Sequence, residues 1–104
     1  MSTTLTVPDP AVFPEDVRRF AAERGVTPYL APLYNLARRC FPGAEVTIAL
    51  NVDGEIADLA WIVYEVDADQ FDREHRRAGR AAFTDEKVRT LPPAGRGAFA
   101  LRVR

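Results

Sequence analysis

Four arginines at helical spacing are the residues whose types and positions best suit a chemical role: Arg73, Arg76, Arg77 and Arg80. At about 100° per residue, all of them fall on one side of a helix. A row of guanidinium groups can bind phosphates, RNA or an acidic protein surface. The competing interpretation is a solvated helix face. Asp69 and Asp72 precede Arg73 and Arg76 by four residues, and such pairs stabilise an exposed helix by roughly 0.2–0.5 kcal/mol each. We favour the solvated face and retain nucleic-acid or phosphate binding by the row as the alternative function.

Residues for nucleophilic catalysis are scarce. Ser2 is the only serine, and it lies at the N-terminus. Cys40 is the only cysteine and falls on the apolar side of a predicted helix, where a thiol is ordinarily packed and unreactive. His75 is the only histidine, and we expect it to pack against the fold or to cap its helix. We therefore assign no catalytic residue and lean away from an enzyme, although carboxylate- or arginine-based chemistry stays open.

The sequence also lacks the patterns that bind metals and cofactors. Asp53, Glu55 and Asp58 gather near a predicted turn, but the alternating oxygen ligands and closing Glu of a calcium loop do not follow. One cysteine and one histidine are too few for a zinc site. No glycine-rich phosphate loop or dinucleotide fingerprint occurs. We expect neither a metal nor a cofactor.

Length and composition set the frame. The chain has 104 residues and a formal net charge of −1, with 47% hydrophobic and 28% charged residues. These values predict one globular domain, at residues 13–104, after a flexible N-terminal segment at residues 1–12. A nearly neutral chain argues against a generic polyanion binder. No apolar run approaches about 18 residues and no secretory leader pattern occurs, so we expect a cytoplasmic protein without membrane contact.

A β-hairpin is the element around which the predicted fold is built. Polar and apolar residues alternate from Glu45 to Asn51, and a second apolar run extends from Ala60 to Val66. The two runs flank Asp53-Gly54, a dipeptide typical of hairpin turns.

Two turn geometries give this hairpin opposite faces. A two-residue turn at Asp53-Gly54 places Trp61 on the face of Ile48. A type I turn opened by Asn51, with Gly54 as a left-handed bulge residue, reverses that assignment. We prefer the bulged form because Asn and Gly suit its first and fourth positions. The residues of the second run that then join Val46, Ile48 and Leu50 are Ile56, Ala60, Ile62, Tyr64 and Val66.

The preferred register leaves an apolar strip on the reverse face of the sheet: Leu59, Trp61 and Val63. A polar outer face would not carry a tryptophan between two aliphatic residues. Either another part of the monomer covers the strip, or the strip binds a partner. The second explanation carries a function. It predicts a small non-catalytic binding module that associates with a second copy of itself or with another protein through this strip.

Three helices and a last strand complete the pattern. Helices are predicted from residue 14 to 24 and from 32 to 41, after an irregular turn at Thr27-Pro28. A strand at residues 98–103 ends the chain. The sequence thus predicts a two-layer α+β fold of order α-α-β-β-α-β, with helices packed on a three-stranded sheet. We expect a core of Phe20, Leu33, Leu36, Val46, Ile48, Leu50, Ile62, Tyr64 and Phe71.

The third helix carries the arginines. Asp67 is the expected N-cap, with Gln70 three residues later, and the helix is predicted from Ala68 to Phe83. A separate short turn should follow at residues 84–87. The inward side is expected to comprise Phe71, His75, Ala78 and Ala82.

Three stretches carry a family resemblance: Thr27-Pro28-Tyr29-Leu30, Ala37-Arg38-Arg39-Cys40-Phe41-Pro42 and Ile62-Val63-Tyr64-Glu65-Val66. Over residues 27–104 the chain resembles small uncharacterised bacterial α+β proteins of helix–hairpin–helix–strand layout. Some of these resemble the antitoxin-like partners in two-gene operons. The resemblance implies a protein partner and assigns no site residue.

Overall fold

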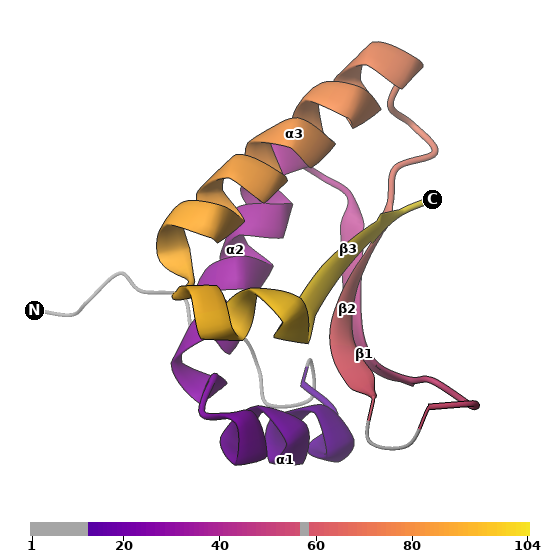
Figure 1. The fold of residues 1–104 in the computed structure, drawn as a ribbon. Helices are drawn as coiled ribbons and strands as arrows, with labels where there is room; N and C mark the ends of the chain where they lie inside the picture. Colours follow the sequence, from indigo (N-terminus) through magenta and orange to yellow (C-terminus); the bar gives the residue numbers. More distant parts are fainter. Residues whose placement is uncertain (1–12, 57–58) are drawn as a thin grey trace, which may run out of the picture.

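A three-stranded sheet with helices on one side makes up the fold in the computed structural model, which describes residues 13–56 and 59–104 (Figure 1). The α+β class and the three strands agree with the prediction. The expected flexible segment at residues 1–12 lies outside the described residues. The elements in chain order are α1 (Glu15–Arg24), the 3₁₀ turn η2 (Thr27–Tyr29), α2 (Leu30–Cys40), β1 (Glu45–Val52), β2 (Ala60–Asp67), α3 (Arg73–Thr90), the 3₁₀ segment η3 (Pro93–Ala98) and β3 (Phe99–Val103).

The first helix begins and ends where its sequence signals predict. Pro14 precedes it, and Glu15 and Asp16 stand in the first turn, where the helix dipole favours acidic side chains. Gly25 ends it with a left-handed φ of 69°, and the N–H of Val26 donates to the carbonyl of Ala21. Helix α1 is therefore specified locally.

The sheet is mixed, in the order β1-β2-β3. Strands β1 and β2 are antiparallel, with Ile48 opposite Tyr64 and Leu50 opposite Ile62. Strand β3 runs parallel to β2 after the crossover through α3. The preferred face assignment is confirmed for Ile62, Tyr64 and Val66, which lie on the buried face with Val46 and Ile48.

The predicted turn itself is wrong. Strand β1 continues through Val52, and the strands pair again only at Ala60. The Asp53 carboxylate accepts hydrogen bonds from the N–H groups of Glu55 and Ile56, at 2.8 and 3.0 Å, so an Asx-type turn opens a longer loop. Gly54 has no positive φ, and Ile56 is 57% exposed instead of joining the core. The face assignment survives because the register moves by an even number of residues.

The core lies between the sheet and the helices, and its centre is Tyr64 on the middle strand. Tyr64 is fully buried, and its hydroxyl donates a 2.9 Å hydrogen bond to the carbonyl of Leu30 in α2. Its ring packs near those of Phe83 in α3 and Phe99 in β3. Most of the predicted core is buried, whereas Leu50 and Phe71 are only half-buried against its edge.

Helix α3 differs from the prediction at its start. Asp67 is still paired in β2, and the N–H of Ala68 donates to the carbonyl of Arg104 beyond β3. These bonds keep residues 67–71 out of the helix, so Asp72 provides the cap. Beyond residue 83 the helix continues without a break through Thr90.

The buried side of α3 also differs from the prediction. Its buried residues are Gly79 and Phe83, whereas His75, Ala78 and Ala82 are exposed. A Cβ at Gly79 would lie 2.7 Å from the Phe41 ring and 2.9 Å from the Cys40 carbonyl oxygen. The helices therefore approach each other at Gly79, and small alanines on a neighbouring side gave a misleading periodicity.

Substitution Ile48→Ala should lower the free energy of unfolding by about 2–5 kcal/mol, because Ile48 is 5% exposed and packs in the core. Urea denaturation measures this loss. The control is Thr47→Ala on the opposite face of the same strand, where an exposed side chain predicts a change within about 0.5 kcal/mol. Equal losses in the two variants would contradict the burial of the Ile48 face of β1.

Substitution Gly79→Ala should destabilise the protein although alanine is the better helix former. The gain in helix propensity is about 1 kcal/mol, whereas overpacking against the fully buried Phe41 ring and a backbone oxygen costs about 1–3 kcal/mol. Thermal denaturation tests the sign. Ala81→Gly, at an exposed position of α3, measures the propensity difference alone. A more stable Gly79→Ala variant would disprove the close helix approach.

Candidate functional site

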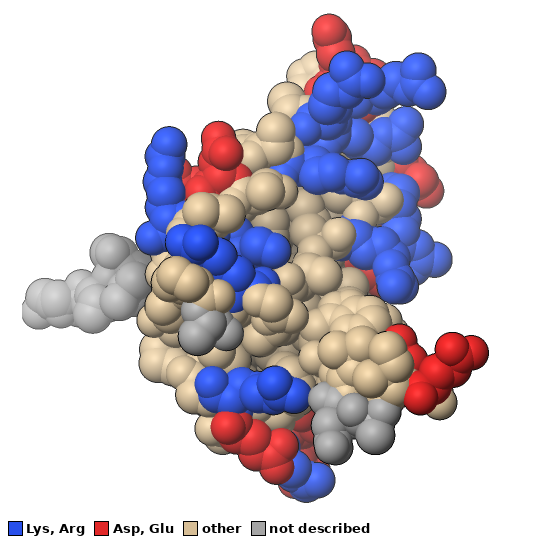
Figure 2. Space-filling view, in the orientation of Figure 1, with Lys and Arg blue, Asp and Glu red and all other residues tan. Residues whose placement is uncertain are grey.

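The four predicted arginines do come together. They lie on α3 along a groove of about 320 Å³, which Val103 of β3 completes. Figure 2 shows Lys and Arg side chains gathered along α3, above the C-terminal half of β3. We call this set the arginine row: Arg73, Arg76, Arg77 and Arg80. Arg76 is half-buried and the other members are exposed.

The acid-to-base pairs expected along this helix do not form. Asp69 precedes the helix and contributes instead to a pocket at the opposite face of the sheet. Asp72 accepts the backbone N–H of His75 at 2.8 Å, and its Oδ1 lies 2.7 Å from the His75 Nδ1. Arg76 acts on Asp72 only as a nearby charge. No member of the row makes an ion pair within the described structure.

Four arginines elsewhere in the described structure form ion pairs. Arg19 pairs with Glu15, Arg89 with Glu86, and both Arg102 and Arg104 with Glu65. Within the row, by contrast, members stand three or four residues apart and repel one another. Each like-charge pair at such spacing costs an exposed helix roughly 0.2–0.5 kcal/mol. The uncompensated charge weakens the solvated-face interpretation and favours an external anion.

Asp72 is the N-cap that organises the start of this helix. Hydrogen bonds from the His75 backbone N–H and with the His75 ring hold the pKa of Asp72 below its ordinary value. His75 is thus an exposed residue of the capping turn, which agrees with the capping half of its prediction and not with inward packing.

Farther along α3, Lys87 contacts β3. The Lys87 Nζ donates a 3.1 Å hydrogen bond to the carbonyl of Phe99, and burial lowers the pKa of this ammonium. Lys87 therefore ties the helix to the start of β3, immediately before the segment that borders the arginine row.

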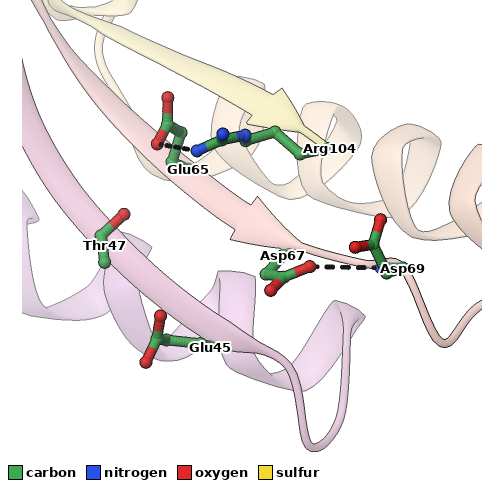
Figure 3. A pocket seen from close by; sticks show the side chains of 6 residues that line it. All are labelled: Glu45, Thr47, Glu65, Asp67, Asp69 and Arg104. Atoms are coloured by element: carbon green, nitrogen blue, oxygen red, sulfur yellow. Dashed lines mark hydrogen bonds and ion pairs between the residues drawn. The ribbon is translucent and has the colours of Figure 1, made fainter.

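The far face of the sheet carries a charged pocket that the sequence analysis missed. Figure 3 shows its lining, which consists of Glu45, Thr47, Glu65, Asp67, Asp69 and Arg104. Glu65, one of the lining residues, forms ion pairs with Arg102 at 2.8 Å and with Arg104 at 3.2 Å. The available signal is the alternation of the strands: once the register is known, the odd-numbered positions of β1 and β2 and the even-numbered positions of β3 lie on this face. The pocket's basic and acidic groups partly neutralise each other.

The remaining part of the far face is mostly apolar and holds the predicted partner strip. Leu59 is 40% exposed and Trp61 is half-buried. Val63 lies between Ala49 and Ala100 in the sheet and is only 4% exposed, so it offers little surface to a partner. No described helix lies over this face (Figure 1).

Apolar exposure continues around the end of the hairpin. Val52 is 63% exposed and Ile56 is 57% exposed. Backbone hydrogen bonds join Asp53 to Leu59 and Leu59 to Ile56, which keeps these segments adjacent. We define the hairpin surface as Val52, Ile56, Leu59 and Trp61; it extends around the end of the hairpin, because Val52 is on the helix side of the sheet and Trp61 on the far face.

Cys40, which the sequence predicts to be packed and unreactive, lies at a helix contact. It is half-buried in a groove between α2 and α3 that His75 and Glu86 also line. Burial raises the pKa of the Cys40 thiol, and the neighbouring Arg39 only partly offsets this effect. A reactive cysteine requires a lowered pKa. Ser2 and Asp58 lie outside the described residues.

Residues 13–56 and 59–104 contain no cluster of three or more His, Cys, Asp or Glu side chains arranged to hold a metal ion. Over the same residues, no helix has the length and apolarity that a membrane span requires. Comparisons with protein-family models, curated proteins and solved structures returned no match.

Substitution Asp72→Asn should make the thermal stability of the protein less dependent on pH below neutrality. A carboxyl with a lowered folded-state pKa stabilises the fold above its unfolded-state pKa, near 3.9, and that contribution is lost as the pH falls through the folded-state value. Asparagine still caps the helix but does not titrate. Thermal midpoints at about pH 7 and about pH 3 should therefore differ less in the variant than in the wild type.

The matched control for this comparison is Thr84→Ser, which changes an exposed, uncharged side chain within the same helix. Its midpoints should differ between the two pH values as much as those of the wild type. An Asp72→Asn profile that parallels the wild type would show that the capping bond does not depend on charge.

Proposed function

We propose that the protein is a two-layer α+β binding module without catalytic activity, which associates with a protein partner through the hairpin surface. The supporting observation is the concentration of exposed apolar residues at one end of the molecule. Of the large hydrophobic residues that stand out as exposed in the described chain, Val52, Ile56 and Leu59 belong to this surface, and Val88 lies elsewhere. Apolar side chains gathered this way mark interaction sites more often than scattered ones do.

Trp61 gives the surface its centre. Tryptophan contributes large contact area and is enriched among the residues that dominate binding energy. The half-buried Trp61 ring lies beside Asn51 on the paired strand, so apolar and hydrogen-bonding groups adjoin. Such a surface suits a partner that covers the ring and leaves polar groups at the rim.

The simplest partner is a second copy of the same chain, related by a two-fold axis. A two-fold interface needs one self-complementary patch, and the hairpin surface is apolar on both copies. A cytoplasmic homodimer is accordingly the assembly that we propose. A different protein partner, as the resemblance to antitoxin-like proteins implies, would use the same surface.

Anion binding by the arginine row is the second candidate function. The supporting observation is that four guanidinium groups line one groove without an ion pair, although the chain as a whole carries a net charge of −1. A bound oxyanion would replace the mutual repulsion of the row with charge-assisted hydrogen bonds. Phosphate, nucleic acid and acidic protein segments all supply such oxygens.

Substitution Leu59→Lys should dissociate the assembly and leave the fold intact, because it places a charge within the apolar patch at a 40% exposed position. Sedimentation equilibrium measures the association, and far-UV circular dichroism checks the fold. Val88→Lys is the matched control, because Val88 is 42% exposed on α3 outside the hairpin surface. It should leave the mass unchanged.

Substitution Trp61→Ala tests the centre of the same surface by the same two measurements. We expect a monomer whose circular dichroism spectrum matches that of the wild type. Replacing a fully buried tryptophan by alanine lowers the free energy of unfolding by about 3–5 kcal/mol, and the loss here should be smaller. A wild-type chain that stays monomeric at high concentration would refute self-association. Equal effects of Leu59→Lys and Val88→Lys would refute the location.

A further inference from the structure

Strand β3 forms an open edge of the sheet. No described strand lies beyond it. The N–H of Arg104 donates to the carbonyl of Val66, and the carbonyl of Arg104 accepts from Ala68, so both groups point toward β2. Backbone directions alternate along a strand, and Leu101 and Val103 therefore turn their N–H and C=O groups to the outer edge.

The start of this edge is blocked and its end is free. Lys87 occupies the outward carbonyl of Phe99, which agrees with the alternation. Beyond it, Val103 borders the groove that the arginine row lines, and Leu101 lies two residues before it on the same strand. An open backbone edge and an uncompensated row of positive charge thus meet in one groove.

We propose that this groove binds an extended acidic segment of another protein, which adds to β3 as a fourth strand while its carboxylates pair with the arginine row. This inference specifies the ligand of the anion-binding role proposed above and rests on it. Backbone hydrogen bonds to Leu101 and Val103 supply the alignment, and guanidinium–carboxylate pairs supply the selection for acidic side chains.

The dimensions of the two elements match. Arg73 and Arg80 are seven residues apart in α3, a rise of about 10 Å. Side chains on one face of a strand repeat about every 7 Å. A strand with an acidic residue at every second position therefore presents two or three carboxylates along the row.

Charge argues against the two competing occupants. A second copy of this chain paired edge to edge through β3 would bring two arginine rows together, which is repulsive. A long nucleic acid would extend beyond the row onto a protein whose overall charge is negative, with acidic residues at the neighbouring far-face pocket. A short acidic strand fits within the basic groove and avoids both conflicts.

The binding test uses a fluorescent peptide that alternates Glu with Thr, titrated with the full chain at low salt and followed by polarisation. Substitution Arg77→Glu should weaken binding about tenfold or more, because a charge-assisted contact becomes a repulsion. The matched control is Arg18→Glu, which reverses an exposed arginine on α1 and should change affinity less than about twofold. Equal losses in the two variants would overturn the location.

Two further peptides test strand addition. One carries N-methyl groups at its Glu residues and the other at its Thr residues, so that charge is kept and alternate amides are blocked. Only one set of amides can face β3, so one peptide should lose about tenfold in affinity and the other should not. Equal binding of both would show attraction without strand pairing and would overturn the proposal.

Amide hydrogen exchange locates the contact. The peptide should slow exchange at Leu101 and Val103 and leave Ala100 and Arg102, which already face β2, unchanged. Unchanged exchange at Leu101 and Val103 would refute strand addition at this edge.

Two other anions are titrated in the same way: an oligonucleotide with the same net charge as the peptide, and inorganic phosphate. If either binds in an Arg77-dependent manner and the peptide does not, the acidic-strand proposal fails and the anion-binding role survives. If none of the three binds at low salt, both fail.

Discussion

The arrangement of the helices on the sheet depends on the hydrogen bond that the buried hydroxyl of Tyr64 donates. A phenol that is removed from water must find a partner, and the Leu30 carbonyl at the first residue of α2 provides it. The same ring packs near Phe83 of α3 and Phe99 of β3, so one side chain of the middle strand contacts three other elements. Burial raises the pKa of Tyr64 and keeps the hydroxyl neutral. Because the helices pack on this face, no described helix covers the opposite face of the sheet, and no described strand pairs with the outer edge of β3.

This one-sided packing sorts the charges of a nearly neutral chain. Acidic residues of β1 and β2 lie in the far-face pocket with Arg104, which follows β3, whereas the arginine row lies along α3. The net charge is the sum over the whole chain, so it reveals neither the acidic pocket nor the arginine row. The net charge, which argues against a generic polyanion binder, therefore does not decide whether a single groove binds an anion. Anion binding depends on the local density of positive charge, and the fold determines which charged side chains lie close together.

Sequence patterns anticipated the parts that local rules determine. Helix α1 follows from its proline start and glycine end, and the buried face of β2 follows from the alternation of its residues. The turn was missed because the Asp53 carboxylate bonds to two backbone N–H groups and opens a longer loop, which dipeptide preferences do not foresee. The even shift in register preserved the faces all the same.

The first residue of α3 and its buried side could not be predicted from the neighbouring residues in the sequence. A hydrogen bond from Ala68 to Arg104, residues far apart in sequence, delays the helix, and a close approach to Phe41 selects Gly79 for burial. The arginine row was nevertheless found, because its spacing alone places it on one side of a helix. Its lack of ion pairs and the open edge beside it appear only in three dimensions.

The central claim is that the hairpin surface is covered by a partner chain, and the emission of the single tryptophan tests it most directly. Trp61 is half-buried in the monomer, so association should remove its remaining water contact. The claim predicts a shift of Trp61 emission to shorter wavelength as the protein is concentrated through its association range. An emission maximum that stays constant from dilute to concentrated solution would contradict it.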